Sequence, residues 1–171
     1  MTDLRTMLVP LGRGLAAVID AADAALVTEY RWRPLPQPRG RWYAVADHRR
    51  HLLYMHRLIL GARPGEMIDH ANGNGLDNRR CNLRLATNTQ NMANTGKHRL
   101  NRPPSSQYKG VHWDSARGAW KALIGDGHGR QRFLGRFSSE EEAARAYDEA
   151  ALEQWGEFAR LNFPRSALLA A

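Results

Sequence analysis

The chain has 171 residues, a formal net charge of +8 and 43% hydrophobic residues, which is enough for one or two small packed domains. The charge favours a polyanionic partner, and a generically basic protein is the alternative interpretation. A single cysteine excludes an intramolecular disulfide, and no apolar stretch is long enough to cross a bilayer. With no secretory leader at the N-terminus, we expect a cytoplasmic protein without a membrane partner.

Residues 1–54 have the pattern of a β-rich scaffold built from short strands and turns. A short helix is expected over 20–30, with Asp20 as its cap and Trp32 anchoring it against the core. Apolar stretches between turn residues predict four strands, at 8–11, 15–19, 42–46 and 52–56.

Two stretches of this scaffold are rich in arginine. Residues 31–41 combine arginine with proline and are expected to form a loop. Arg49, Arg50 and His51 follow a predicted strand. They either contact the DNA backbone or form a solvated turn, and the sequence leaves both interpretations open.

Residues 55–96 are crowded with asparagine, aspartate and histidine. Asp69 and His70 follow a short apolar segment, and the Asn-Gly dipeptides of 72–75 favour tight turns. A hairpin followed by a short helix that carries Asn91 would bring these polar residues together.

These residue types point to phosphodiester hydrolysis. Asp69 offers a carboxylate and Asn91 a carbonyl oxygen for one divalent cation, while His70 can act as the base. The absence of soft ligands favours Mg²⁺ or Mn²⁺. Because adjacent strand residues point to opposite faces, a local distortion or the cation itself must bring Asp69 and His70 to one phosphate.

The set Asp69, His70, Asn82 and Asn91, with Met55–Arg57 upstream, resembles the H-N-N form of the HNH homing endonucleases. The resemblance implies a ββα-metal nuclease core in which His70 is the general base and Asp69 and Asn91 bind the metal. Asn82 is then the residue that orients the loop presenting His70. Zinc-stapled members of the family need two cysteine pairs, so no structural zinc is expected in this chain.

A basic, proline-containing linker is expected at 97–107, and a second unit at 108–164. Three strands should form an antiparallel meander, at 108–113, 119–124 and 130–135. A helix should follow, capped by Ser138 or Ser139 and ended by Gly156.

The charge of this second unit is polarised. Residues 108–136 carry six basic and two acidic residues, whereas 138–158 carry one basic and seven acidic residues. With the helix on one side, the other face of the sheet is free to enter a DNA major groove. Trp113 and Trp120 could instead be core residues. We favour the core position for Trp120. Six residues are the expected DNA contacts: Lys109, Trp113, Arg117, Lys121, Arg130 and Arg132.

The second unit resembles the AP-two/ethylene-response-factor (ERF) DNA-binding domain across nearly its full length. The matching segments are Tyr-Lys-Gly-Val at 108–111, Phe-Leu-Gly-Arg-Phe at 133–137, Glu-Glu-Ala-Ala-Arg-Ala-Tyr-Asp at 141–148 and Leu-Asn-Phe-Pro at 161–164. The first strand lacks most of the arginines of the plant members, so their base preference is not carried over. The same domain occurs appended to HNH homing endonucleases, which supports both resemblances.

Together these patterns predict an α+β protein with a scaffold at 1–54, a nuclease core at 55–96, a linker at 97–107 and a DNA-binding domain at 108–164. We expect a metal-dependent, site-directed endonuclease of the homing type, a monomer rather than a dimer, acting on double-stranded DNA in a bacterial or phage-infected cell. The alternative is a non-catalytic, sequence-specific DNA-binding regulator that retains a degenerate nuclease scaffold.

Overall fold

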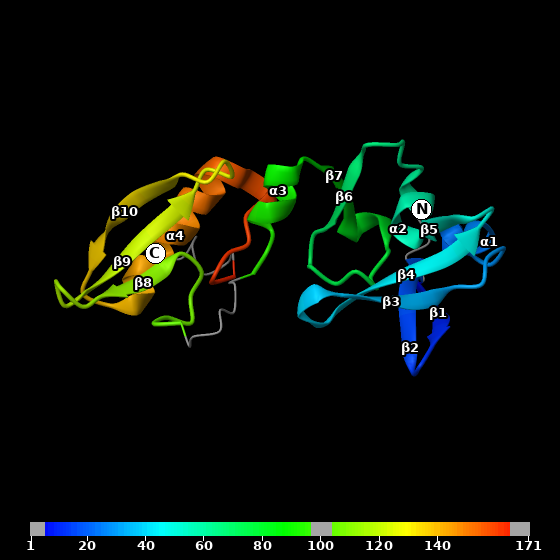
Figure 1. Cartoon of the computed structure of the whole chain (residues 1–171), viewed down its shortest axis with the longest axis horizontal. Coiled ribbons are helices and arrows are strands. Elements are labelled where there is room, and N and C mark those ends of the chain that lie inside the picture. The colour runs from blue at the N-terminus through cyan, green and yellow to red at the C-terminus, as the bar shows by residue number, and fades with distance from the viewer. Residues whose placement is uncertain (1–5, 97–103, 165–171) are drawn as a thin grey trace. The chain divides into compact units, whose positions relative to one another are not determined.

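The computed structural model describes residues 6–96 and 104–164, which divide into two compact units at Thr87/Asn88 (Figure 1). This division falls before the helix of Asn91, whereas the sequence places a linker at 97–107. Residues 97–103 of that linker lie outside the described residues. Among the described residues, no helix combines the length and apolarity that crossing a membrane requires.

The first unit contains a two-stranded hairpin and a three-stranded antiparallel sheet in the order β3-β4-β5 (Figure 1). The hairpin strands are β1 (Thr6–Gly12) and β2 (Leu15–Asp20), and the sheet strands are β3 (Arg33–Gln37), β4 (Arg41–His48) and β5 (His51–Tyr54). The helices are η1 (Ala21–Asp23), α1 (Ala24–Val27), η2 (Pro38–Gly40) and α2 (Met55–Leu60).

One core holds the first unit together. Ile19, Val27, Met55 and Ile59 come from three different elements and have at most 2% of their surface exposed. Trp32 donates its indole N–H to the carbonyl of Val27 at 2.7 Å, so it anchors the short helix as the sequence predicts.

The predicted loop at 31–41 was wrong, because it contains the strand β3. Pro34 and Pro36 belong to this strand and pair with Ala44 and Trp42 of β4. Proline lacks an N–H group and is therefore confined to edge strands, and β3 is an edge strand of its sheet.

A second hairpin and a helix complete the central stretch. The strands β6 (Met67–His70) and β7 (Leu83–Ala86) pair antiparallel, with η3 (Arg80–Asn82) just before β7. The helix α3 (Asn88–Ala93) follows and is counted with the second unit.

The second unit is a three-stranded antiparallel sheet, ordered β10-β9-β8, with α4 packed on one face (Figure 1). Its elements are β8 (Val111–Asp114), β9 (Ala119–Gly125), β10 (Gln131–Phe137), α4 (Glu140–Trp155) and η4 (Gly156–Phe158). Ser139, one of the two predicted caps, forms a capping box with Glu142, and Gly156 ends the helix as predicted. The α+β fold class is therefore confirmed.

Candidate active site and nucleic-acid interface

The hairpin β6–β7 positions the adjacent Asp69 and His70. Asp69 is paired with Arg84 and His70 with Leu83, and the register continues through both pairs without a bulge. The two side chains therefore leave the strand on opposite sides. The local distortion that the sequence analysis considered is absent from this hairpin.

Asp69 is buried and holds an ion pair with Arg84. Its Oδ2 accepts from Arg84 Nη2 at 2.6 Å and from Nε at 2.9 Å. This side-on pairing uses the geometry that suits a guanidinium to a carboxylate. Any cation that binds Asp69 shares this carboxylate with Arg84 or displaces the guanidinium.

His70 is a buried imidazole, 5% exposed, surrounded by aromatic rings and one amide. Its ring stacks on Tyr43 at 5.7 Å between centroids and meets His56 edge-on at 5.1 Å. Its Nε2 lies 3.3 Å from Oδ1 of Asn78, a side chain that is fully buried. In a neutral ring whose Nε2–H donates to Asn78, the basic lone pair is carried by Nδ1.

The surroundings of His70 favour its neutral form. Burial lowers the pKa of His70, and the hydrogen bond to Asn78 and the charges of Asp69 and Asp77 oppose this shift. Burial also lowers the pKa of the neighbouring His56, to about 3. Both imidazoles are therefore neutral at pH 7, the state in which His70 can accept a proton.

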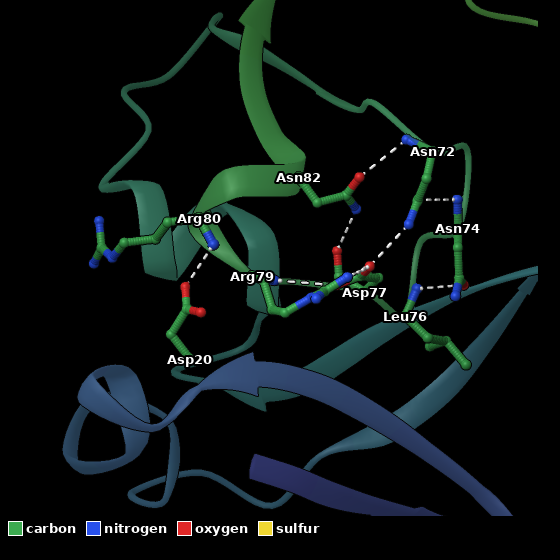
Figure 2. Close-up of polar contacts among 8 residues, drawn as sticks. All are labelled: Asp20, Asn72, Asn74, Leu76, Asp77, Arg79, Arg80 and Asn82. Carbon is green, nitrogen blue, oxygen red and sulfur yellow. Dashed lines mark hydrogen bonds and ion pairs between the residues drawn. The ribbon is translucent and has the colours of Figure 1, made fainter. Parts of the chain in front are cut away.

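Asn82 ties together the loop between β6 and β7. Its Oδ1 accepts from the backbone N–H of Asn72 at 2.9 Å, and its Nδ2 donates to the backbone carbonyl of Asp77 at 2.7 Å (Figure 2). The Asp77 carboxylate in turn accepts from Arg79 and from Asn72 Nδ2. The described contacts of Asn82 are thus to the loop rather than to His70.

The same loop is docked on β2. Val18 donates its N–H to Leu76 at 2.8 Å and accepts from Asn78 at 2.7 Å. Asp20, expected to cap a helix through its side chain, makes no such cap. Its carboxylate instead accepts from the Arg80 N–H at 2.8 Å (Figure 2). The scaffold therefore fixes the loop that carries Asn78 and holds His70.

Asn78 is not among the site residues predicted from the sequence. It lies in the Asp77-Asn78 pair of the turn-rich segment, and nothing in local spacing separates its role from that of other asparagines nearby. The contact with His70 depends on the docking of the loop on β2, which only the three-dimensional structure reveals.

Asn91, the second expected metal ligand, lies on α3 in the second unit and is half-buried. The hairpin of Asp69 and His70 belongs to the first unit. Whether Asn91 and Asp69 share a cation thus stays a prediction.

The donor types suit a hard cation. Within residues 6–96 and 104–164, no cluster of three or more histidine, cysteine or acidic side chains gathers around a common point. Mg²⁺ is commonly held by one or two carboxylates, with waters and substrate phosphates as the other ligands. The buried Asp69 carboxylate fits such a site as the charged ligand, and an amide oxygen could serve as a neutral ligand beside it.

The register of the second unit shows which residues share the uncovered face of its sheet. Ala122 and Ile124 are buried with residues of α4, so the alternate residues Lys121 and Leu123 lie on the opposite face. Paired residues share a face, which adds the cross-strand partners of Lys121 and Leu123 to this uncovered face: His112, Phe133 and Arg136.

Arg132 and Lys109, both expected DNA contacts, lie near α4 and not on the uncovered face, so their contact with DNA stays a prediction. Arg132 pairs with Ile124, and its Nη2 is 3.5 Å from Glu153 of α4. Lys109 donates its ammonium to the carbonyl of Ala93 at 2.5 Å and lies near the Tyr147 ring of α4.

The remaining expected contacts have different positions. Trp113 is 43% exposed, but it pairs with Trp120, and their rings meet at 5.0 Å. Trp120 packs against the core, as favoured. Arg117 and Arg130 are exposed in the two turns that flank β9, and Arg117 lies 3.6 Å from Asp114.

Arg136 was missed because the predicted strand ended at Gly135, and β10 also contains a bulge. The register shifts between Phe133 and Gly135, so Phe133 and Arg136 face the same side although they are three residues apart. The Arg136 guanidinium lies 5.0 Å from the Phe133 ring centre and 3.0 Å from Asp114 Oδ2. The glycine within the predicted strand was the available signal, because such glycines often mark bulges.

Two family models match the chain. Residues 53–93 match the model described as HNH endonuclease, and residues 106–157 match the model described as AP2 domain. The first covers β6, the loop, β7 and α3. The second covers the three-stranded sheet and all of α4.

Curated relatives reflect the same two parts. An uncharacterized HNH endonuclease of Acanthamoeba polyphaga mimivirus is 29% identical over 152 residues, which are 88% of this chain and 76% of that protein. An AP2-like ethylene-responsive transcription factor of Arabidopsis thaliana is 38% identical over 95 residues, 46% of this chain. A rice protein with AP2/ERF and B3 domains is 51% identical over 67 residues, 39% of this chain.

The plant similarities are partial. This chain spans 31% of the Arabidopsis protein's length and 18% of the rice protein's length. No solved structure matches the chain significantly.

Proposed function

Because the chain belongs to the HNH endonucleases through its central segment and carries an AP2 domain after it, we propose that it is a metal-dependent, site-directed DNA endonuclease. The AP2 unit selects and binds double-stranded DNA, and the HNH unit hydrolyses a phosphodiester bond. The observation that carries the catalytic part is the His70 environment, a buried neutral imidazole held by a fully buried amide.

In the proposed reaction His70 accepts a proton from the water that attacks the scissile phosphate. Asn78 holds the ring by its Nε2, and Tyr43 supports one face of it. Asn82 acts through the loop, because it joins Asn72 to Asp77 and so maintains the segment that carries Asn78. It is a positioning residue in this scheme.

Asp69 and Asn91 are the proposed ligands of one Mg²⁺ or Mn²⁺ ion. When bound, such an ion supplies charge stabilisation to the phosphate and the leaving oxygen. In the absence of a metal ion, the ion pair with Arg84 compensates the charge of the buried Asp69 carboxylate. No structural zinc is proposed, because the chain has a single cysteine and zinc-stapled members need two cysteine pairs.

We further propose that the protein is a monomer of the homing type that works in the cytoplasm of a bacterial or phage-infected cell. One active site per molecule favours nicking of a single strand. The second candidate function is a non-catalytic DNA-binding regulator, which the ion pair between Asp69 and Arg84 favours because it occupies a proposed ligand.

A nicking assay on supercoiled plasmid, with and without Mg²⁺, separates the two functions. We expect the wild-type protein to nick only with the metal, and the His70→Ala variant to lose nicking while it binds DNA nearly as before. Nicking by His70→Ala at the wild-type rate would remove His70 from the mechanism. Wild-type protein that binds DNA without nicking it would favour the regulator.

A further inference from the structure

The turn between β4 and β5 holds two arginines in a backbone conformation that side chains rarely adopt. Arg49 has a φ of 47° and Arg50 a φ of 67°, and the flanking His48 and His51 are a cross-strand pair. A two-residue hairpin turn with both φ values positive is of type I′, for which Asn-Gly is the preferred sequence. Residues other than glycine are uncommon in this region and carry strain there.

Both arginine side chains are exposed at the tip of the hairpin. In the part of the chain that the structure describes, neither guanidinium has a hydrogen bond or an ion pair. The nearby Arg33 of β3 differs, because its guanidinium is paired with Asp47 at 3.1 Å. The turn therefore presents two adjacent, uncompensated guanidinium groups, which suit the phosphate oxygens of a DNA duplex.

The position of the turn relative to His70 fixes which phosphates it can reach. Tyr43, which stacks on His70, lies on β4 six residues before Arg49, the first residue after that strand. At the rise of a β-strand this separation is about 20 Å. That length corresponds to roughly six phosphates along one DNA strand. The turn thus lies too far from His70 to touch the scissile phosphate, and in range of the flanking backbone.

We propose that the β4–β5 turn is a DNA-backbone clamp, in which Arg49 and Arg50 bind phosphates of duplex DNA to one side of the bond that His70 attacks. This inference rests on the proposed function and adds a contact surface in the first unit. Backbone contacts contribute affinity and orientation but no base preference. Arginine at these two positions makes the turn less stable than Asn-Gly would.

The test replaces the turn by its preferred sequence, with Arg49→Asn and Arg50→Gly in the full chain. We expect two changes in opposite directions: a melting temperature several degrees higher, and a several-fold weaker affinity for DNA. The slope of log K against log salt should fall by about 1.8, since each phosphate contact contributes about 0.9. Fluorescence anisotropy with a synthetic mixed-sequence duplex in EDTA measures binding without cleavage.

Two controls are needed. One separates the effect of the charges from that of the backbone, and the other separates the position of the charges from their number. Arg49→Gln with Arg50→Gln removes the charges but keeps the strained turn, so it should weaken binding without raising the melting temperature. Arg13→Gln with Arg33→Gln removes two positive charges from elsewhere in the same unit. This second control should leave the salt slope nearly unchanged.

The outcomes distinguish this inference from the proposed function. An Asn-Gly variant with the wild-type salt slope overturns the clamp while DNA binding itself stands. A control variant at Arg13 and Arg33 that loses as much slope overturns the assignment to this turn. Wild-type protein that fails to bind any duplex contradicts the proposed function instead.

Discussion

At the scale of single residues, His56 is the group whose burial has the clearest consequence for pH. It is 8% exposed, and its Nδ1 has no hydrogen-bond partner within the described residues. Burial is the largest cause of its lowered pKa, and the charges of His70 and Arg57 lower it further, to about 3. Such a group stabilises the folded state only as a neutral ring, because its protonation would place a charge in a site without water.

We predict that His56 makes the first unit sensitive to acid. The unfolded chain takes up a proton near the ordinary pKa of 6.5, whereas the folded chain does so only near 3. Stability is therefore complete above pH 6.5 and is lost as the pH falls below it. At pH 5 the loss from this residue is about 2 kcal/mol. The His56→Leu variant, which keeps a similar volume, should lose correspondingly less stability.

Urea unfolding followed by circular dichroism at pH 7.5 and pH 5 measures this difference. The change in unfolding free energy between the two pH values is compared in wild type and His56→Leu. This comparison removes the contribution of the carboxylates, which both proteins share. The same loss of stability in wild type and His56→Leu would show that His56 is not the source of the acid sensitivity.

At the scale of elements, the site depends on how closely the loop after β6 approaches β4. A Cβ atom added at Gly75 would lie 2.4 Å from the carbonyl oxygen of Trp42 and 2.4 Å from the Tyr43 ring. The first of these neighbours is backbone and cannot turn aside. Because Tyr43 stacks on His70, the size of this glycine is coupled to the position of the proposed base.

We expect Gly75→Ala to push the loop away from β4 and to disturb the ring stack on His70. The unit should lose about 1–3 kcal/mol of stability, the usual range for overpacking, and plasmid nicking should fall. Gly96→Ala is the matched control, because nothing lies within 4 Å of its added Cβ and its φ is not positive. A Gly75→Ala variant with wild-type melting temperature and nicking would contradict this coupling.

The limits of sequence analysis are also visible at this scale. Alternation and capping patterns predicted the strands and α4 because these depend on neighbours within a few residues. The pattern of alternation failed at β10, where a bulge moves Arg132 to the helix side and Arg136 to the uncovered face. It also failed at β3, where two prolines are compatible with an edge strand that local sequence cannot distinguish from a loop.

At the scale of the whole molecule, the motifs identified the two families from sequence but not the contacts between distant segments. Asp69, His70 and Asn82 were predicted as a group, and the structure places them on one hairpin and its loop. Several of their partners lie on the same hairpin and loop, whereas Tyr43 of β4, which stacks on His70, and Val18 of β2, on which the loop docks, are far away in the chain. Such partners follow from tertiary packing, which spacing along the sequence does not encode.

The uncovered face of the second unit gives a prediction for DNA binding by the full chain. Lys121 and Arg136 are a cross-strand pair on that face, whereas Arg132 lies on the side of α4. Lys121→Ala with Arg136→Ala should therefore weaken binding and lower the salt slope by about 1.8. Arg132→Ala removes a charge of the same strand and serves as the control, with little expected change in slope.

Anisotropy titrations of each variant against the same duplex over a range of salt concentrations provide the measurement. The salt slope distinguishes the two faces, because only groups that neutralise phosphates release counterions. If Arg132→Ala lowered the slope as much as the double variant, the bulge would not decide which arginine meets DNA. The prediction that the uncovered face is the binding surface would then be wrong, since the helix side would bind equally well.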